Sequence, residues 1–257
     1  MGRPIVIIQE DSEALAGKAA DLITECAQDA IRERGRFTLV LSGGSTPEKT
    51  YALLAQPDRM ATIDWSKTFV FFGDERMVPP EDPRSNFAMA RRALLDRATV
   101  PDSNVFPIPT GKRSPAEAAK AYAECLARFF SASPASGPPR FDLVLLGLGE
   151  DGHTASLFPG AAALDVEDAW VAWSSPGTLP PPVDRVTLTY PVLNAARQVV
   201  FLVSGESKAA ALRDVLEGRA DRNRRPAAGV RPTDGTVTWL VDRDAAKLVS
   251  VSYSVIS

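Results

Sequence analysis

Short apolar runs alternate with longer amphipathic stretches along most of the chain, which is the pattern of strands and helices in turn. Several of the runs, such as "FTLVL" from Phe37, are apolar without alternation, which is typical of strands covered on both faces by helices. Strands are predicted at residues 5–8, 37–44, 67–76, 105–109, 141–149, 185–190, 198–205 and 237–241. Helices are predicted at residues 12–34, 45–55, 85–96, 114–130, 206–218 and 242–249.

This β-then-α order predicts a doubly wound α/β fold with a mostly parallel sheet. Two loops, Ser131–Pro139 and Ser174–Pro182, are rich in Pro, Ser and Gly and have the composition of linkers. Because the β/α order continues on both sides of them, we interpret them as surface loops. The sequence therefore predicts a single domain over residues 1–257.

Glycines follow four of the predicted strands, in "LSGGSTP", "FFGDERMVP", "LGLGEDGHTAS" and "LVSGESK". In doubly wound folds, ligands bind beyond the carboxyl ends of the strands. The residues of this chain whose side chains best suit catalysis or ligand binding all lie in these four segments or beside a further strand end. We therefore expect one site at this edge of the sheet.

The segment "SGGSTP" has the features of an anion-binding loop. Gly43 and Gly44 allow the backbone to approach an anion closely, and Ser45 offers a hydroxyl at the predicted start of a helix. Unpaired N–H groups at a helix N-terminus favour phosphate. The segment is neither GxGxxG nor a P-loop, so neither a dinucleotide nor a nucleoside triphosphate is indicated. The simpler interpretation is a well-capped turn between strand and helix.

Two cations are candidates for the same phosphate. Lys208 lies in the first turn of a predicted helix, where a positive charge is unfavourable unless an anion is bound nearby. Arg185 opens a predicted strand after a proline-rich loop. Taken singly, each can also be an ordinary surface charge.

His153 is the one histidine of the chain, and it follows a glycine-rich strand end. An imidazole suits proton transfer near neutral pH. Asp151 is close enough in sequence to orient its ring, and Asp74 and Arg76 follow another strand, where they can bind sugar hydroxyls or support catalysis. The alternatives are an incidental loop histidine and, for "DER", a local ion pair. No GxSxG segment supports a serine triad.

Composition removes several other functions. A net charge of −3 with 24% charged residues does not fit a nucleic-acid-binding protein. Cys26 and Cys125 fall on apolar helical stripes and are interpreted as core residues, so with a single histidine no metal site is expected. No apolar stretch is long enough for a membrane span, and the first residues do not form a signal peptide. We expect a cytoplasmic monomer that binds a small molecule.

Five segments together resemble the 6-phosphogluconolactonase family of the glucosamine/galactosamine-6-phosphate isomerase-like superfamily. They are "LSGGSTPEKTYALLA", "FFGDERMVPPEDPRSNF", "GLGEDGHTASLFPG", "RVTLTYPVLNAARQVVFLVSGESKAAAL" and "PAAGVRPTDGTVTWLVD". The resemblance implies a modified Rossmann-like fold, shared with glucosamine-6-phosphate deaminases, and hydrolysis of 6-phospho-D-glucono-1,5-lactone to 6-phospho-D-gluconate without metal or cofactor. This reaction is the second step of the oxidative pentose phosphate pathway.

The resemblance also implies roles for individual residues. It makes His153 the general base and places Asp74 and Arg76 in the lactonase "DER" motif. Phosphate binding is implied for the remaining matched positions, which are Gly43, Gly44, Ser45, Arg185 and Lys208. The loops 78–84 and 174–184 match no distinctive motif.

Two other functions fit parts of this pattern. A glucosamine-6-phosphate deaminase is expected to carry a glutamate a few residues after the histidine, where this chain has Ser156, Leu157 and Phe158. A sugar-phosphate-sensing module of a transcription regulator is expected to carry a DNA-binding extension, and the first predicted strand already begins at Ile5. Both are therefore weaker than the lactonase.

Overall fold

A seven-stranded parallel sheet forms the centre of the fold, as the pattern of apolar runs predicts. The computed structural model describes residues 5–133, 136–175 and 181–250. The strand order is β1-β10-β9-β6-β2-β3-β5, and every neighbouring pair is parallel. The strands are β1 (Ile5–Gln9), β2 (Phe37–Leu41), β3 (Thr68–Phe72), β5 (Val105–Phe106), β6 (Leu143–Leu146), β9 (Gln198–Val203) and β10 (Thr236–Asp242). The fold class predicted from sequence is confirmed.

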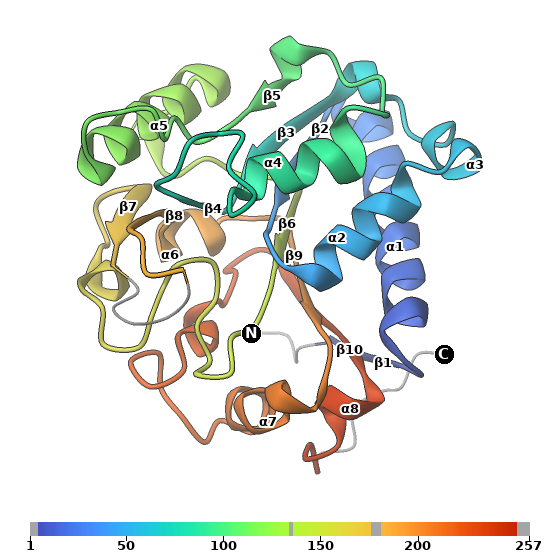
Figure 1. The fold of residues 1–257 in the computed structure, drawn as a ribbon, viewed down its shortest axis with the longest axis vertical. Coiled ribbons are helices and arrows are strands. Elements are labelled where there is room, and N and C mark those ends of the chain that lie inside the picture. The colour runs from blue at the N-terminus through green and yellow to red at the C-terminus, as the bar shows by residue number, and fades with distance from the viewer. Residues whose placement is uncertain (1–4, 134–135, 176–180, 251–257) are drawn as a thin grey trace.

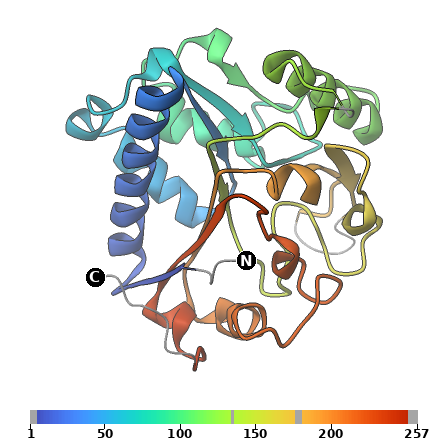
Figure 2. The same cartoon turned by 180° about the vertical axis from the view of Figure 1, so that it is seen from behind.

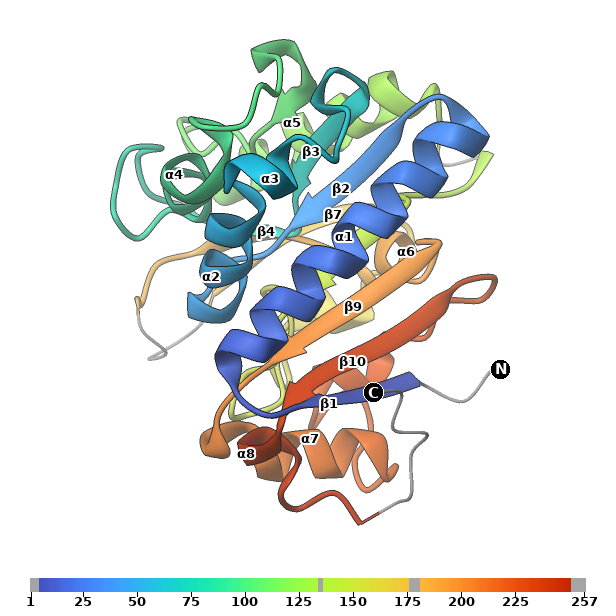
Figure 3. The same cartoon turned by 90° about the vertical axis from the view of Figure 1, so that its right-hand side faces the viewer.

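Helices cover both faces of this sheet (Figures 1–3). On one face, α1 (Ser12–Arg34) runs along the strands and packs beside α2 (Ser45–Leu54). On the other face lies α5 (Pro115–Phe130). The remaining helices are short: α3 (Pro57–Met60), α4 (Asn86–Ala90), α6 (Tyr190–Leu193), α7 (Ala209–Leu216) and α8 (Arg243–Ala246). Both faces of the sheet are therefore buried, which explains why β2 and β6 are buried at every position.

A second, three-stranded antiparallel sheet lies beside α5 (Figure 1). Its strands are β4 (Asp74–Arg76), β8 (Arg185–Leu188) and β7 (Val171–Ser174), in the order β4-β8-β7. The predicted strand 67–76 is in fact two strands that belong to different sheets. They divide at Gly73, whose N–H donates to Leu41 O at 2.9 Å in the large sheet and whose C=O accepts from Leu188 N at 2.8 Å in the small one.

One hydrophobic core joins the large sheet, the small sheet and the helices. Cys26 is buried in it and Cys125 packs against it, and both thiols are free, in agreement with the core interpretation. The predicted helix 85–96 begins as α4 and continues as a π-helical turn over Arg91–Leu95. Residues 134–135 and 176–180 of the two predicted surface loops lie outside the described residues, and the single domain over 1–257 stays a prediction.

Candidate active site

The four glycine-rich segments follow four consecutive strands of the sheet, β9-β6-β2-β3. From β2 the chain proceeds to β3 and β5 on one side, whereas from β6 it proceeds to β9 and β10 on the other. The neighbouring ends of β2 and β6 therefore flank the topological switch point, where open α/β sheets bind ligands. The four segments thus lie at the same edge of the sheet, after neighbouring strands.

A pocket of about 230 Å³ lies at this position. Six of the residues predicted from sequence line it, namely Gly43, Gly44, Asp74, Arg76, His153 and Arg185. The other lining residues are Ser42, Asn86, Gly147, Leu148, Gly149, Thr154, Ala155 and Phe158. The pocket thus combines one imidazole, one carboxylate and two guanidinium groups with backbone from two glycine-rich loops.

His153 is held by Asp151, as the sequence indicated. Its Nδ1 lies 2.6 Å from Asp151 Oδ1, which also accepts the backbone N–H of His153 at 3.0 Å. Burial acts to raise the pKa of Asp151, but the hydrogen bonds from His153 outweigh it and the pKa lies below its usual value. Because an ionised carboxylate only accepts hydrogen bonds, Nδ1 of the neutral ring carries the hydrogen and Nε2 is the basic nitrogen.

Position 149, which packs against this imidazole, requires a glycine. A Cβ added to Gly149 would lie 2.1 Å from His153 Nδ1 and 2.6 Å from Asp151 Oδ1. The Phe158 ring packs against the imidazole in a tilted arrangement, with the two ring centroids 4.9 Å apart. The ring is therefore fixed by packing as well as by its hydrogen bond, while 30% of the His153 side chain remains exposed.

Asp74 is buried and is held by uncharged donors. Ser156 Oγ donates to its Oδ2 at 2.6 Å, and Asn86 Nδ2 donates to its Oδ1 at 3.2 Å. Among the described residues, no Lys, Arg or His nitrogen lies within 4.0 Å of the Asp74 carboxylate. The sequence did not indicate Asn86 or Ser156 as partners of Asp74. Its carboxylate is therefore oriented in the pocket by hydrogen bonds, without an ion-pair partner among the described residues.

Arg76 and Arg185 lie directly opposite each other on the antiparallel strands β4 and β8. Arg185 is only 5% exposed, and its guanidinium donates to two backbone carbonyls, Val183 O at 3.1 Å and Pro181 O at 3.0 Å. Burial lowers the pKa of Arg185, and the charge of Arg76 lowers it further. Arg76 Nε is buried without a hydrogen-bond partner among the described residues. Like charges directly opposite each other destabilise a sheet, and an anion bound between these two arginines would reduce their repulsion.

Three predicted site residues do not line this pocket. Asp151 lies behind its wall and contacts it through the hydrogen bond to His153. Ser45 is exposed at the first position of α2, with Gly44 as the N-cap. Lys208 is half-buried at the start of α7, after β9. Ser45 and Lys208 both follow strands at the carboxyl edge of the sheet and lie outside the wall of the pocket.

Ala155 is the lining residue with an unusual backbone. Its φ of 47° lies in the left-handed region, which an L-residue adopts at a cost. It occupies the turn in which Leu157 N donates to Thr154 O at 2.9 Å. Sequence reasoning could not find this position, because alanine carries no signal for a positive φ.

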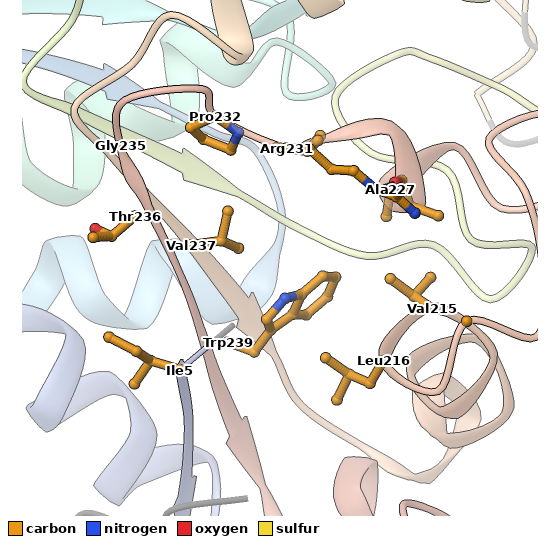
Figure 4. Close-up of a pocket in the computed structure, with 13 residues that line it drawn as sticks. Ile5, Val215, Leu216, Ala227, Arg231, Pro232, Gly235, Thr236, Val237 and Trp239 are labelled. Atoms are coloured by element: carbon orange, nitrogen blue, oxygen red, sulfur yellow. Dashed lines mark hydrogen bonds between the residues drawn. The ribbon is translucent and has the colours of Figure 1, made fainter. Parts of the chain in front are cut away.

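A larger pocket of about 330 Å³ lies between α7, β10 and the segment 226–236 (Figure 4). Its walls are mostly apolar, with Trp239 at the base and Arg231 as the one ionisable side chain among the described residues that line it. It offers no base and no paired cations, so the smaller pocket is the candidate active site.

Within residues 5–133, 136–175 and 181–250, three or more His, Cys, Asp or Glu side chains nowhere gather as a possible metal site. In the same part of the chain, no helix has the length and apolarity to cross a membrane.

The model of a protein family described as glucosamine-6-phosphate isomerases/6-phosphogluconolactonase matches residues 10–239. The chain belongs to this family. A curated 6-phosphogluconolactonase from Nostoc sp. is 41% identical over 246 residues, which cover 96% of this chain and 98% of the relative.

Two solved structures share the fold. A 6-phosphogluconolactonase from Trypanosoma cruzi aligns with a TM-score of 0.87 at 32% identity, covering 97% of this chain and 98% of that one. A monomeric glucosamine-6-phosphate deaminase aligns with a TM-score of 0.76 at 23% identity, covering 95% and 99% of the two chains. The second likeness supports the fold alone.

Proposed function

We propose that this protein is a 6-phosphogluconolactonase in which His153 is the general base. The observation that carries the mechanism is the pocket in which the His153–Asp151 pair and two facing arginines lie at the switch point of the sheet. The named relatives support the substrate, a phosphorylated sugar lactone.

The phosphate of the substrate binds between Arg76 and Arg185. A phosphate dianion carries two negative charges, which balance the positive charges of these two opposed guanidinium groups. It also offers a hydrogen-bond acceptor to Arg76 Nε, which has no partner among the described residues. The backbone of Gly43 and Gly44, at the N-terminus of α2, contributes further donors. Ser45 and Lys208 act from the rim. The sequence left Arg76 open between binding sugar hydroxyls and supporting catalysis, and we assign it to the phosphate.

The reaction needs one base and no covalent nucleophile, because a lactone is already an activated ester. His153 Nε2 takes a proton from water as the water oxygen attacks the lactone carbonyl carbon. The tetrahedral intermediate then collapses, the bond from C1 to the ring oxygen breaks, and the imidazolium returns the proton to the departing hydroxyl. Asp151 stabilises the imidazolium between these two transfers.

Asp74 completes the site as an acceptor for sugar hydroxyl groups. Its carboxylate is already fixed by Ser156 and Asn86 and lies in the wall of the pocket. Ser156 also bears on the deaminase alternative. Its hydroxyl, in the stretch where a deaminase is expected to carry glutamate, binds Asp74 instead of offering an acid to the substrate.

The test is direct measurement of hydrolysis. NMR or stopped-flow pH-indicator kinetics with freshly prepared lactone should show enzyme-dependent formation of 6-phosphogluconate above the spontaneous rate. Glucosamine-6-phosphate, incubated in parallel, should release no ammonia. Ammonia release without lactone hydrolysis would replace the lactonase with a deaminase. A single domain, a cytoplasmic location and a monomeric state complete the proposal.

A further inference from the structure

Glu75 lies next to two site residues in sequence, yet its side chain points away from the pocket and into the protein. It is 2% exposed and has no cation within 4.0 Å among the described residues. Instead, four donors converge on its two oxygens. Oε1 accepts the backbone N–H groups of Arg76 at 2.7 Å and Asn86 at 2.8 Å, and Oε2 accepts Phe87 N at 2.8 Å and Ser85 Oγ at 2.9 Å.

This arrangement requires an acceptor at all four positions. Burial raises the pKa of Glu75, and the four hydrogen bonds oppose that rise. A carboxylate can accept from every donor present, whereas an amide of the same shape must turn its NH₂ toward at least one backbone N–H. Glu75 therefore ties the end of β4 to the start of α4.

Asn86, the residue that Glu75 holds by its backbone, brings its own side chain into the pocket. It is 2% exposed, and its Nδ2 donates to the backbone oxygen of Asp74 at 2.9 Å and to Asp74 Oδ1 at 3.2 Å. Its Oδ1 has no donor among the described residues and packs against Gly43, where an added Cβ would lie 1.9 Å away. Asn86 thus links the carboxylate that faces the sugar to the loop that faces the phosphate.

We propose that Glu75 and Asn86 are positioning residues of this site, Glu75 by fixing Arg76 and Asn86, and Asn86 by fixing the carboxylate of Asp74. The inference rests on the proposed function, because the reaction supplies its readout. Loss of either residue leaves the phosphate contacts of Arg185 and the glycine loop in place and disturbs the orientation of the sugar ring. Misplacement of reacting groups by about 1 Å can cost ~100-fold in rate.

The experiment compares two isosteric variants, Glu75→Gln and Asp142→Asn. Asp142 is also a buried carboxylate, and it accepts Thr38 N at 2.9 Å and Thr38 Oγ1 at 2.7 Å. Unlike Glu75 it also accepts Arg34 Nε, at 2.9 Å, and it precedes β6 at the opposite end of the strands. Both variants should lower the unfolding midpoint. Only Glu75→Gln should lower kcat for the lactone, by about 10- to 100-fold, with a smaller rise in KM because the same carboxylate also holds Arg76, a phosphate contact.

Asn86→Asp and Asn86→Ala test the same proposal if Glu75→Gln does not fold. Both remove the donor to Asp74, and the first keeps the side-chain volume, so each should show the same loss in kcat with a nearly unchanged KM. Folded variants of Glu75 or Asn86 with wild-type kcat would overturn the positioning roles. Equal losses in kcat for Glu75→Gln and Asp142→Asn would also overturn them, since they would mark a general effect of destabilisation. Wild-type protein that does not hydrolyse the lactone would instead refute the proposed function.

Discussion

Tyr51→Phe removes one hydroxyl that supports the phosphate loop from behind. Tyr51 lies on α2 and is fully buried. Its OH accepts Ser42 N at 3.0 Å and donates to Ser42 O at 3.0 Å, so it satisfies both backbone groups of the residue just before Gly43. Burial raises the pKa of Tyr51, so the hydroxyl remains a donor throughout the physiological range.

The magnitude follows from the two groups left behind. A buried backbone group without a partner costs about 1–3 kcal/mol, so Tyr51→Phe should lower the free energy of unfolding by at least about 2 kcal/mol. For a protein of this size, that corresponds to a fall in Tm of roughly 4–8 °C.

Urea denaturation and thermal unfolding, followed by circular dichroism, measure the effect. Tyr190→Phe is the matched control. Among the described residues the Tyr190 hydroxyl bonds only to Pro226 O, to which it donates at 2.8 Å, so that variant should lose about half as much free energy of unfolding. A Tyr51→Phe protein as stable as the wild type would refute the claim that the hydrogen bonds of this hydroxyl to Ser42 stabilise the loop.

Three further predictions concern the site. Arg185→Ala should raise KM by about 10- to 100-fold with little change in kcat, since a charged hydrogen bond to phosphate contributes about 1.5–3 kcal/mol to both ground and transition states. Lys208→Ala should raise KM by a smaller factor. If steady-state kinetics show no change in KM for either variant, the phosphate assignment is wrong. Asp151→Asn should lower kcat by about 10- to 100-fold, because the imidazolium loses its counter-charge. Because the pKa of Asp151 is lower in the folded state, its hydrogen bond to His153 stabilises the fold fully above the unfolded pKa near ~3.9 and is lost as pH falls through the lower folded pKa. The free energies of unfolding of the wild type and Asp151→Asn should therefore differ at neutral pH and become equal in strong acid. EDTA should leave activity unchanged, and inactivation that added metal reverses would show that a metal takes part.

The parallel sheet and its helices could be predicted because their signal is local. Continuous apolar runs mark β2 and β6, and a helix as long as α1 carries its own caps, with Asp11 accepting from Glu13 N and Ala14 N and Gly35 at a φ of 72°. The rule that ligands bind at the carboxyl ends of the strands then brought Gly43, Asp74 and His153 together without any three-dimensional information.

The small sheet could not be predicted from the same pattern. "KTFVFFGDER" reads as one strand, because nothing in the run shows that the chain changes sheet at Gly73. The strand β8 shows its apolar residues but not its partner, so the opposition of Arg76 and Arg185 depends on a register that only the folded chain defines. The strand β7 is too short to give a clear alternation.

Asn86 was missed for a related reason. Its importance depends on Glu75, which holds its backbone, and on Asp74, which accepts from its side chain. These contacts join β4 to α4 across a loop that carries no distinctive motif. By contrast, Asp151 and His153 are separated by one glycine, and their interaction could be expected from the sequence alone.

The central claim is that His153 is the base that activates water, and single-turnover and steady-state kinetics of His153→Ala test it most directly. The variant should fold, bind 6-phosphogluconate with near wild-type affinity by isothermal titration calorimetry, and lose about 10²–10⁴-fold in kcat. A folded His153→Ala protein that binds the product and keeps a wild-type kcat would contradict the mechanism and move the search for the base to Asp74.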